Sequence, residues 1–420
     1  LTFQGNNDNR PPIVYIGAND GMLHAFNAKD PGDDTDAPIL GEELFAYIPN
    51  LVFQNLAAFT SPDYDHHYYV DLTPTVQTKV TLPSGSDKTI LIGGLGKGGK
   101  GYFALDITDP LSMDTATKVA EKVLWEFPVS ADDDMGFSYS KPVIVPSYDD
   151  QNPWIIIFGN GYGSPNGNAV LYILNPAKQP SGDLLLKKLE LGGGPDNGVS
   201  SATPVDVDFD RIVDYVYVGD LKGNIWKLDL TAENAADWDV AFSDGSTPKP
   251  LFTAVGPDNA IQPITSKVEV TPHPKEEGYI VFFGTGKFLG DGDFVDASVQ
   301  TVYGIWDYGD DEDDSEYIGT VIRGADGSIT GLSNLSGTST LLQHNVKDFA
   351  YALPNGEVMN VRVLNPENPD ETEPKWITEP DVTADQDPDP STTESNHLGW
   401  YFDLSDRERV DTDVLLREGR

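Results

Sequence analysis

The hydrophobic residues of this chain occur in pairs of short runs separated by a turn. In each pair the first β-rich run ends in glycine, the turn contains a further Gly or Asn, and the second run ends in Asn or Asp. Because short apolar runs bounded by turn residues are typical of strands, the pattern predicts β-hairpins. Five copies occupy residues 13–27, 90–106, 155–175, 215–229 and 279–307.

The five copies form a repeat with a noisy period. The glycines that end the first runs lie 60–76 residues apart, which is somewhat longer than a common propeller blade. Loop insertions would explain the excess. A further short run with a shared opening precedes four of the hairpins, and its proline stands near the strand start, where no ladder N–H is needed. These runs are residues 71–76, 140–144, 203–205 and 263–268.

Each unit is therefore predicted to be an antiparallel meander of about four strands. Such a unit cannot bury its own face unless neighbouring units stack around a ring. We predict an all-β chain that folds as a seven-bladed β-propeller with long inserted loops. Five blades are visible in the repeat, and residues 349–364 and 399–404 are expected to supply strands for one or two more.

A single propeller domain is predicted over residues 9–420. Residues 1–8 are expected to be a disordered end or the remnant of a protease-cleavable tag, and lie outside the fold. Two stretches, 309–316 and 366–396, are rich in acidic residues or in Pro, Asp, Glu and Thr. Such composition is typical of solvated loops, so both are predicted to be irregular insertions.

Composition narrows the class of function. The chain of 420 residues has 27 Lys and Arg against 68 Asp and Glu, a formal charge of −41, which argues against nucleic-acid binding because a phosphate backbone needs a basic face. It contains no Cys, so disulfides, thiolate metal sites and Cys nucleophiles are excluded. No apolar run approaches eighteen residues, so membrane insertion is not expected.

One short segment carries the residues for a metal site. In residues 206–214 acidic side chains stand at relative positions 1, 3, 5 and 9, and the Ile212 carbonyl at position 7, as in the start of an EF-hand calcium loop. Arg211 replaces the usual glycine and no glutamate follows at position 12, so Asp214 would have to be the bidentate ligand. The sequence predicts Ca²⁺ bound by Asp206, Asp208, Asp210, Ile212 and Asp214.

A merely acidic surface turn is the alternative to this calcium loop. The corresponding loops of the sibling units, residues 82–87, 147–152 and 272–277, lack the acidic ladder, so general acidity is not its cause. Packed carboxylates repel one another, and a divalent cation relieves that repulsion. Mg²⁺ is the poorer fit, since it demands regular octahedral geometry and keeps its waters.

Three other motifs are weaker. Residues 94–101 match glycine-rich phosphate-loop patterns, but a strand and not a helix is predicted to follow, which favours a flexible hairpin turn. His66 and His67 lie beside two aspartates, yet adjacent residues of a strand point to opposite faces, which disfavours a transition-metal site. Asp291, Asp293 and Asp296 form a loose acidic turn that could hold a second cation. A solvated turn without a cation is the favoured interpretation.

The chain resembles the C-terminal propeller domain of the PilC/PilY family of type IV pilus biogenesis and tip-adhesin proteins. The matching stretches run along most of the chain and are highly specific together. They are residues 14–27, 41–49, 93–96, 158–162, 214–221, 223–224, 262–266, 283–287, 303–307 and 399–401.

This resemblance implies a modified, quinoprotein-like propeller whose calcium loop falls on Asp206, Asp208, Asp210, Ile212 and Asp214. It further implies a non-catalytic role at the cell surface and pilus tip, outer-membrane associated, in which calcium occupancy opposes retraction and so affects twitching motility. The implied partners are minor pilins and the N-terminal half of the full-length chain, with the outer-membrane secretin as a further candidate. In this family adhesion belongs to that N-terminal half.

Two other classes of function stay open. A quinone-dependent dehydrogenase has similar propeller repeats. The resemblance to such enzymes implies that they need a vicinal Cys pair over the cofactor, and this chain has no Cys. Their calcium would also lie in the central funnel. A calcium-independent scaffold or carbohydrate-binding propeller is the third possibility, and a melting curve insensitive to calcium would favour it.

Overall fold

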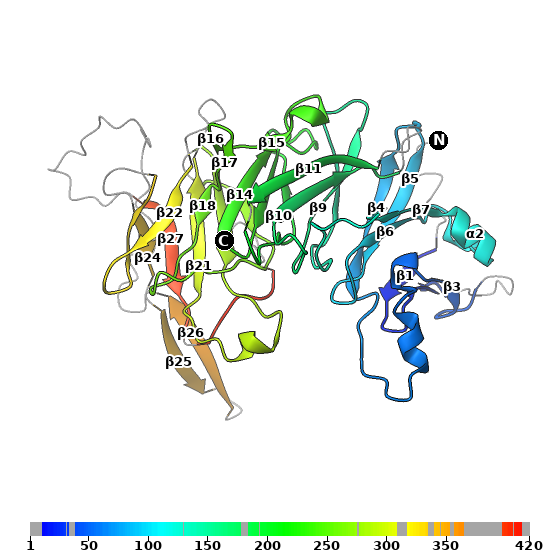
Figure 1. Cartoon of the computed structure of the whole chain (residues 1–420), viewed down its shortest axis with the longest axis horizontal. Coiled ribbons are helices and arrows are strands. Elements are labelled where there is room, and N and C mark those ends of the chain that lie inside the picture. The colour runs from blue at the N-terminus through cyan, green and yellow to red at the C-terminus, as the bar shows by residue number, and fades with distance from the viewer. Residues whose placement is uncertain are drawn as a thin grey trace. The chain divides into compact units, whose positions relative to one another are not determined.

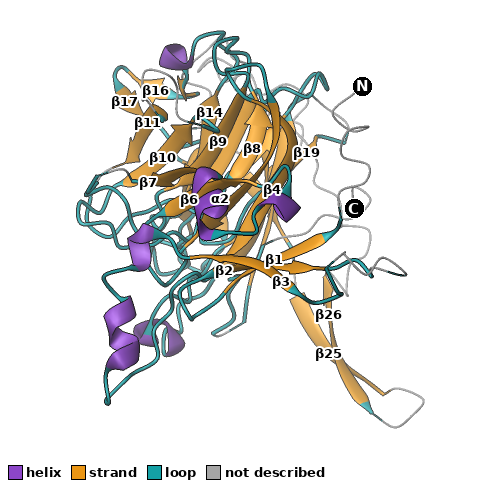
Figure 2. Ribbon diagram, turned by 90° about the vertical axis from the view of Figure 1, so that its right-hand side faces the viewer, coloured by secondary structure: helices purple, strands orange, loops and turns teal. Residues whose placement is uncertain are grey.

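The computed structural model describes residues 11–413 except 31, 33–37, 129, 178–183, 193, 275–276, 309–316, 335–339, 345, 353–356, 365–396 and 406. The predicted tag remnant and the two acidic insertions lie outside the described residues, and the bounds of the domain remain a prediction. The described chain is built mainly of strands with a few short helices (Figures 1 and 2). The prediction of an all-β fold is confirmed.

The chain divides into two compact units. The first comprises Leu1–Val216 with Leu228–Asp239, and the second comprises Tyr217–Lys227 with Val240–Arg420. Each unit is described by itself below.

The first unit contains two four-stranded antiparallel meanders, as the repeat predicts. One runs in the order β4-β5-β6-β7 and the other in the order β8-β9-β10-β11. A three-stranded sheet, β1-β2-β3, precedes them. The strands are β1 (Ile13–Gly17), β2 (Leu23–Asn27), β3 (Glu43–Tyr47), β4 (Leu72–Thr81), β5 (Asp87–Gly94), β6 (Tyr102–Asp106), β7 (Val123–Phe127), β8 (Val143–Pro146), β9 (Trp154–Gly159), β10 (Ala169–Leu174), β11 (Leu185–Gly192) and β12 (Thr203–Val205).

The helices of the first unit are short and lie in connections between strands (Figure 2). They are the α-helix α2 (Ala116–Glu121) and the 3₁₀ helices η1 (Asn50–Val52), η2 (Leu56–Thr60), η3 (Pro110–Ser112) and η4 (Ala235–Asp237). Among the described residues, no helix has the length and apolar character needed to cross a lipid bilayer.

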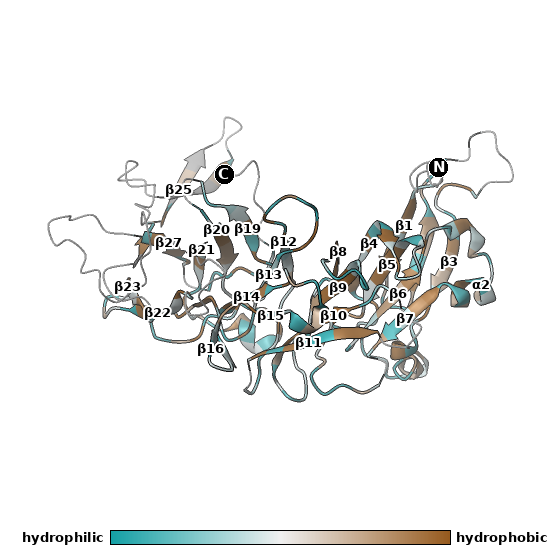
Figure 3. Ribbon diagram, turned by 90° about the horizontal axis from the view of Figure 1, so that it is seen from above, coloured by the Kyte–Doolittle hydropathy of each residue, from teal (hydrophilic) through white to brown (hydrophobic). Residues whose placement is uncertain are grey.

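The inner strands of the meanders are buried on both faces. Every residue of β10 and every residue of β6 is buried, whereas β11 alternates in part with solvent. Continuous apolar runs of this kind are expected where a sheet is covered on both sides. Figure 3 shows the hydrophobic colour concentrated along the strands and the hydrophilic colour in the loops.

The fourth hairpin of the repeat consists of β13 (Tyr215–Gly219) and β14 (Asn224–Asp229), and the division between the units falls within these strands. Its turn depends on Asp220, whose carboxylate accepts hydrogen bonds from the backbone N–H groups of Lys222 and Asn224. Gly223 has φ of 78°, and a Cβ there would lie 2.7 Å from the Gln262 carbonyl oxygen. The turn therefore requires glycine at this position.

The second unit carries the fifth hairpin in a five-stranded sheet of order β19-β20-β21-β27-β24. Its strands and single 3₁₀ helix are β15 (Asp239–Val240, which begins at the boundary), β16 (Ser243–Asp244), β17 (Thr247–Pro248), β18 (Phe252–Thr253), β19 (Glu269–Pro272), β20 (Tyr279–Gly284), η5 (Asp291–Phe294), β21 (Thr301–Asp307), β22 (Gly319–Arg323), β23 (Ile329–Leu332), β24 (Thr340–Gln343), β25 (Val346–Ala352), β26 (Val358–Leu364) and β27 (His397–Asp403).

The structure changes the assignment of the last strands. β27 pairs with β21, so residues 399–404 complete the fifth repeat and do not supply a strand for another blade. Within the described residues, β25 and β26 form a separate two-stranded sheet. Adjacency in the sequence could not indicate the β21–β27 pairing, because about ninety residues separate the two strands. The number of blades remains a prediction.

Candidate metal centre

The acidic loop 206–214 connects β12 to β13, and its own carboxylates shape its backbone. Asp208 Oδ1 accepts a hydrogen bond from the Asp210 N–H at 3.1 Å, and Asp210 Oδ1 accepts one from the Ile212 N–H at 2.7 Å. These are Asx turns, in which a short acidic side chain bonds the backbone two residues ahead. Phe209 and Arg211 adopt φ of 64° and 77°. The alternation of Asp with other residues thus coils the loop tightly.

This coil brings three of the five predicted ligands together. One carboxylate oxygen from each of Asp206, Asp208 and Asp210 lies within 4.8 Å of the other two. Asp206 is partly buried, whereas Asp208 and Asp210 are exposed. Among the described residues, this is the group of three or more acidic or imidazole side chains close enough to share a metal ion.

Asp206 has one carboxylate oxygen that the described residues do not satisfy. Its Oδ2 accepts a hydrogen bond from the Arg211 N–H at 2.7 Å. Its Oδ1 is buried and accepts no hydrogen bond from the residues that the structure describes. A buried oxygen without a partner costs free energy, all the more when it carries negative charge. The donor set is entirely hard oxygen, so a divalent cation such as Ca²⁺ fits the loop chemically.

Asp214 occupies a different environment from the other three aspartates. It is buried, with 4% of its surface exposed, and it is not part of the three-carboxylate cluster. Its Oδ2 accepts a hydrogen bond from the Val207 N–H at 2.7 Å. Burial raises the pKa of this carboxyl, its hydrogen-bond donors partly offset that rise, and the nearby charges of Asp208 and Asp206 add to it. Asp214 and Ile212 remain predicted ligands, and Ile212 makes the N–H bond to Asp210 described above.

The fold places Tyr148, a residue that the sequence pattern did not predict for the site, beside the loop. Its hydroxyl donates to Asp214 Oδ1 at 2.9 Å and lies 3.3 Å from Asp210 Oδ2. Burial, followed by the hydrogen bond to Asp214, raises the pKa of this phenol. Tyr148 belongs to residues 147–152, the sibling loop that served as a contrast because it lacks the acidic ladder. No signal in one strand or loop could reveal a contact made between neighbouring sheets.

The loop is also tied to its surroundings through the backbone. The Val213 N–H donates to the Pro146 carbonyl at the end of β8, at 3.1 Å. The Asp214 N–H donates to the Val205 carbonyl, and the Asp214 carbonyl accepts from the Leu230 N–H. All of these residues belong to the first unit. The position of the acidic loop is therefore coupled to the β8–β11 sheet.

Of the weaker motifs, the glycine-rich segment has the predicted structure and the histidine pair does not. The glycine-rich segment 94–101 joins β5 to β6, so the prediction that a strand and not a helix follows it is confirmed. Residues 61–70 contain no strand, so the argument that His66 and His67 face opposite sides is wrong. Both imidazoles line one pocket, which is described below.

The acidic turn around η5 is satisfied by the protein itself. Asp293 Oδ2 accepts hydrogen bonds from the Leu289 and Gly290 N–H groups, at 2.8 and 3.1 Å. The Lys287 ammonium lies 3.4 Å from Asp293 Oδ1. Although burial opposes it, these donors and this charge lower the pKa of Asp293. Nothing in this turn calls for a second cation.

Comparison with known proteins places these features in a family. The family model described as the PilY1 β-propeller domain matches residues 1–343. A type IV pilus biogenesis factor PilY1 homolog of Xylella fastidiosa is 41% identical over 308 residues, which cover 70% of this chain and 19% of that protein. The type IV pilus biogenesis factor PilY1 of Pseudomonas aeruginosa strain UCBPP-PA14 is 40% identical over 329 residues, which cover 73% of this chain and 26% of that protein.

A solved structure agrees with the sequence comparison. The crystal structure of the Pseudomonas aeruginosa PilY1 C-terminal domain matches with a TM-score of 0.68 and 32% identity, covering 98% of this chain and 76% of that one. The aligned part spans about a fifth to a quarter of the length of the curated relatives. From the repeat, the described sheets and these matches, we conclude that the chain belongs to the PilY1 β-propeller domain family.

Proposed function

We propose that this propeller is a Ca²⁺-binding, non-catalytic module of a type IV pilus biogenesis factor, which supports pilus assembly and opposes retraction when calcium is bound. The observation that carries the calcium assignment is the cluster of Asp206, Asp208 and Asp210, in which the buried Asp206 Oδ1 has no donor within the described part of the chain. The names of the relatives support the pilus assignment.

The residues of the loop define which ion fits. Asp206, Asp208 and Asp210 would supply carboxylate oxygens, and the Ile212 carbonyl and Asp214 would complete the set. When bound, Ca²⁺ supplies positive charge that satisfies these oxygens and offsets their mutual repulsion. The irregular loop, with two left-handed residues, suits the flexible coordination of Ca²⁺ better than the octahedral geometry of Mg²⁺.

The hydrogen bonds around the loop indicate how calcium binding would affect the rest of the first unit. Asp214 and Val213 connect the loop to Tyr148 and to Pro146 of the β8–β11 sheet. Bound Ca²⁺ would offset the repulsion among the aspartates, which otherwise weakens these hydrogen bonds. The first unit would therefore become more rigid when calcium is bound. A rigid module at the pilus tip would hold its partners more firmly, and we propose that this contact opposes retraction and so affects twitching motility.

The proposed location and partners follow from the family. We place the protein outside the cell, at the pilus tip and in association with the outer membrane. Its proposed partners are minor pilins, the N-terminal half of its own full-length chain and the outer-membrane secretin. A contribution to cell adhesion is proposed for the full-length protein. The absence of Cys speaks against a quinone-dependent dehydrogenase that uses a vicinal Cys pair.

Calorimetric titration of the calcium-free chain tests the metal site. Ca²⁺ should bind to the wild-type chain, and binding should disappear in the Asp206→Asn, Asp208→Asn double variant. Asp258→Asn with Asp326→Asn is a matched control, because both are Asx-turn aspartates outside the loop and the pair removes the same charge. Equal binding heats from the wild-type chain and the Asp206, Asp208 variant would refute the assignment.

The pilus role needs a test in a bacterium that makes type IV pili. The full-length protein carrying the same double substitution should yield few surface pili when retraction is active, and normal numbers when the retraction motor is deleted. Few pili in both strains would assign the site to assembly instead. Normal pili and twitching in both strains would refute a role for the loop in pilus dynamics.

A further inference from the structure

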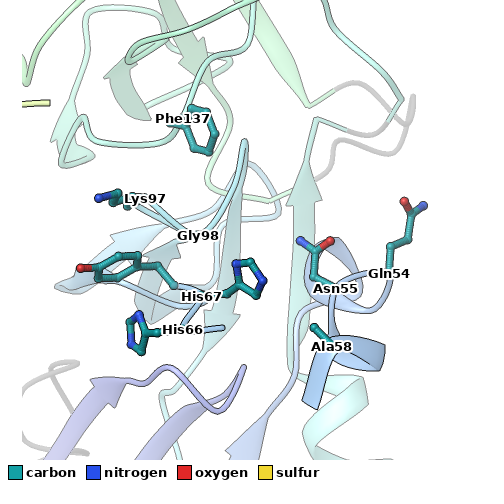
Figure 4. Close-up of a pocket in the computed structure, with 9 residues that line it drawn as sticks. Gln54, Asn55, Ala58, His66, His67, Lys97, Gly98 and Phe137 are labelled. Atoms are coloured by element: carbon teal, nitrogen blue, oxygen red, sulfur yellow. The ribbon is translucent and has the colours of Figure 1, made fainter. Parts of the chain in front are cut away.

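The first unit contains a pocket of about 580 Å³ whose lining includes no residue of the acidic loop. Its volume lies within the range typical of small-ligand sites. Figure 4 shows Gln54, Asn55 and Ala58 on one side and His66, His67 and Lys97 on the other, with Phe137 above. The lining residues are Gln54, Asn55, Ala58, His66, His67, Tyr68, Lys97, Gly98 and Phe137.

The charge of this pocket differs from that of the chain as a whole. The chain has 68 acidic residues among 420, yet none of those that the structure describes lines the pocket. Lys97 forms no ion pair with any residue that the structure describes. Its ammonium instead lies 4.9 Å from the centre of the Tyr68 ring. An ammonium without a carboxylate partner, next to two imidazoles, is suited to receive an anionic group.

The pocket walls are held in place by contacts that the glycine-rich segment makes possible. A Cβ on Gly98 would lie 2.1 Å from the Tyr69 carbonyl oxygen, so only glycine allows the loop carrying Lys97 to approach this closely. Tyr69 is buried, stacks on Phe59 and donates from its hydroxyl to the Asn55 carbonyl at 3.2 Å. Tyr69 therefore holds in place both the loop that carries Lys97 and the side of the pocket that carries Asn55.

Phe137 is anchored separately and presents an exposed ring. The neighbouring Ser138 donates from its hydroxyl to the carbonyls of Gly99 and Gly101, at 3.0 and 2.9 Å. Lys100 lies 5.5 Å from the centre of the Phe137 ring and donates to the Gly163 carbonyl. Despite these supports, the Phe137 ring remains 38% exposed, and Tyr68 remains 37% exposed. Two supported aromatic rings open to solvent are typical of a recognition surface.

The combination of groups favours one class of ligand. A sugar ring has an apolar C–H face that can lie on an aromatic ring, and hydroxyls around its edge that bond amides and imidazoles. The single ammonium matches one carboxylate. A polyphosphate would need more cations than the pocket offers, and the net charge of −41 would repel it. We infer that this pocket binds a saccharide that carries a carboxylate on its ring.

Such a sugar could be a glucuronic acid or a sialic acid, and the experiment distinguishes between the two. The calcium-saturated chain is titrated with a glucuronic-acid oligosaccharide, with a sialic-acid-terminated oligosaccharide and with the neutral glucose counterpart of the first. Binding is followed by calorimetry and by ligand line broadening in NMR. At least one acidic sugar should bind about tenfold more tightly than the neutral one, the usual effect of one hydrogen-bonded charge. The better acidic ligand identifies the source.

Variants then assign the binding to this pocket. Lys97→Gln should weaken binding of the acidic sugar to the level of the neutral one, and Phe137→Ala should weaken both. Lys29→Gln, which changes an exposed lysine outside the pocket, should leave both unchanged. Unchanged melting temperatures would show that the variants fold.

Three results would overturn the inference. They are equal binding of acidic and neutral sugars, no binding of any of the three sugars, and acidic-sugar binding that Lys97→Gln leaves intact. Loss of acidic-sugar binding in the Asp206→Asn, Asp208→Asn variant with retention in Lys97→Gln would place the ligand at the acidic loop and not here.

Discussion

Two acidic turns of this protein have similar sequences but different chemistry. The loop 206–214 and the turn 291–296 both cluster aspartates within a few residues. In the second turn, Lys287 and the backbone N–H groups of Leu289 and Gly290 satisfy Asp293, and Arg409 donates to the carbonyls of Asp293 and Asp296. In the first, Asp206 Oδ1 is buried and has no donor among the residues that the structure describes. Local acidity thus indicates a cation site only where the fold leaves a buried carboxylate oxygen without a donor.

The largest expected effect is the calcium dependence of stability. If Ca²⁺ binds only the folded loop, saturation at about a hundredfold over Kd should raise the free energy of unfolding by roughly 2.7 kcal/mol. Urea unfolding with and without calcium measures this gain. The gain should vanish in Asp206→Asn with Asp208→Asn and persist in Asp291→Asn with Asp293→Asn. Loss of the gain in the second pair would reverse the comparison.

The next effect concerns stability without calcium. Asp293→Asn removes the charge from a buried acceptor of two backbone hydrogen bonds, so it should lower the free energy of unfolding by about 1–3 kcal/mol in chelator. Asp208→Asn, in the exposed part of the other loop, should cost less or should stabilise the metal-free chain, since it relieves repulsion. Equal losses from both substitutions, measured by urea unfolding, would contradict the contrast between the turns.

Tyr148→Phe tests the hydroxyl that supports the metal loop. Removal of its hydrogen bond to Asp214 should cost about 1 kcal/mol of stability, because Asp214 loses a donor in a buried position. Tyr139→Phe is the matched control, since its hydroxyl makes no hydrogen bond with the described residues. If both substitutions change the unfolding free energy equally, Tyr148 has no special part in holding the loop.

The smallest effect is the opposite pH dependence of the two turns. The pKa of Asp293 is lowered below its ordinary value of 3.8, so its contribution to stability is present above that value and is lost as the pH falls through its folded pKa. The stability difference between the wild-type chain and Asp293→Asn should therefore shrink on acidification below about pH 4. Unfolding free energies measured in chelator from pH 3 to 6 give this difference.

Asp214 should show the reverse trend in the same metal-free series. Its pKa is raised, so the folded state holds the proton more tightly than the unfolded chain, and ionisation costs stability as the pH rises above the ordinary carboxyl value. Asp214→Asn should therefore gain stability relative to the wild-type chain over this range. Parallel trends in the two variants would show that their environments do not differ as described.

The sequence predicted local features well. The five hairpins, their closing glycines and the all-β class follow from short-range alternation and turn chemistry, and three of the four predicted preceding strands are present as β4, β8 and β12. The fourth, predicted at residues 263–268, is wrong, because the strand before the fifth hairpin is β19, which begins at Glu269. The Asx turns of Asp208 and Asp210 are equally local, which is why the spacing of the aspartates was informative. The pairing of β27 with β21 was missed because it joins segments separated by a long insertion.

What the sequence determined by itself is therefore the strand repeat, the coil of the acidic loop and the resemblance to a family, all of which depend on residues close together in the chain. Only the tertiary structure decided that Tyr148 supports Asp214, that Asp206 Oδ1 is buried with no donor among the described residues while Asp293 has several, and that His66, His67 and Lys97 share a pocket. The physical reason is that hydrogen bonding, burial and charge depend on which groups of distant segments meet, and residue spacing along the chain does not encode those encounters.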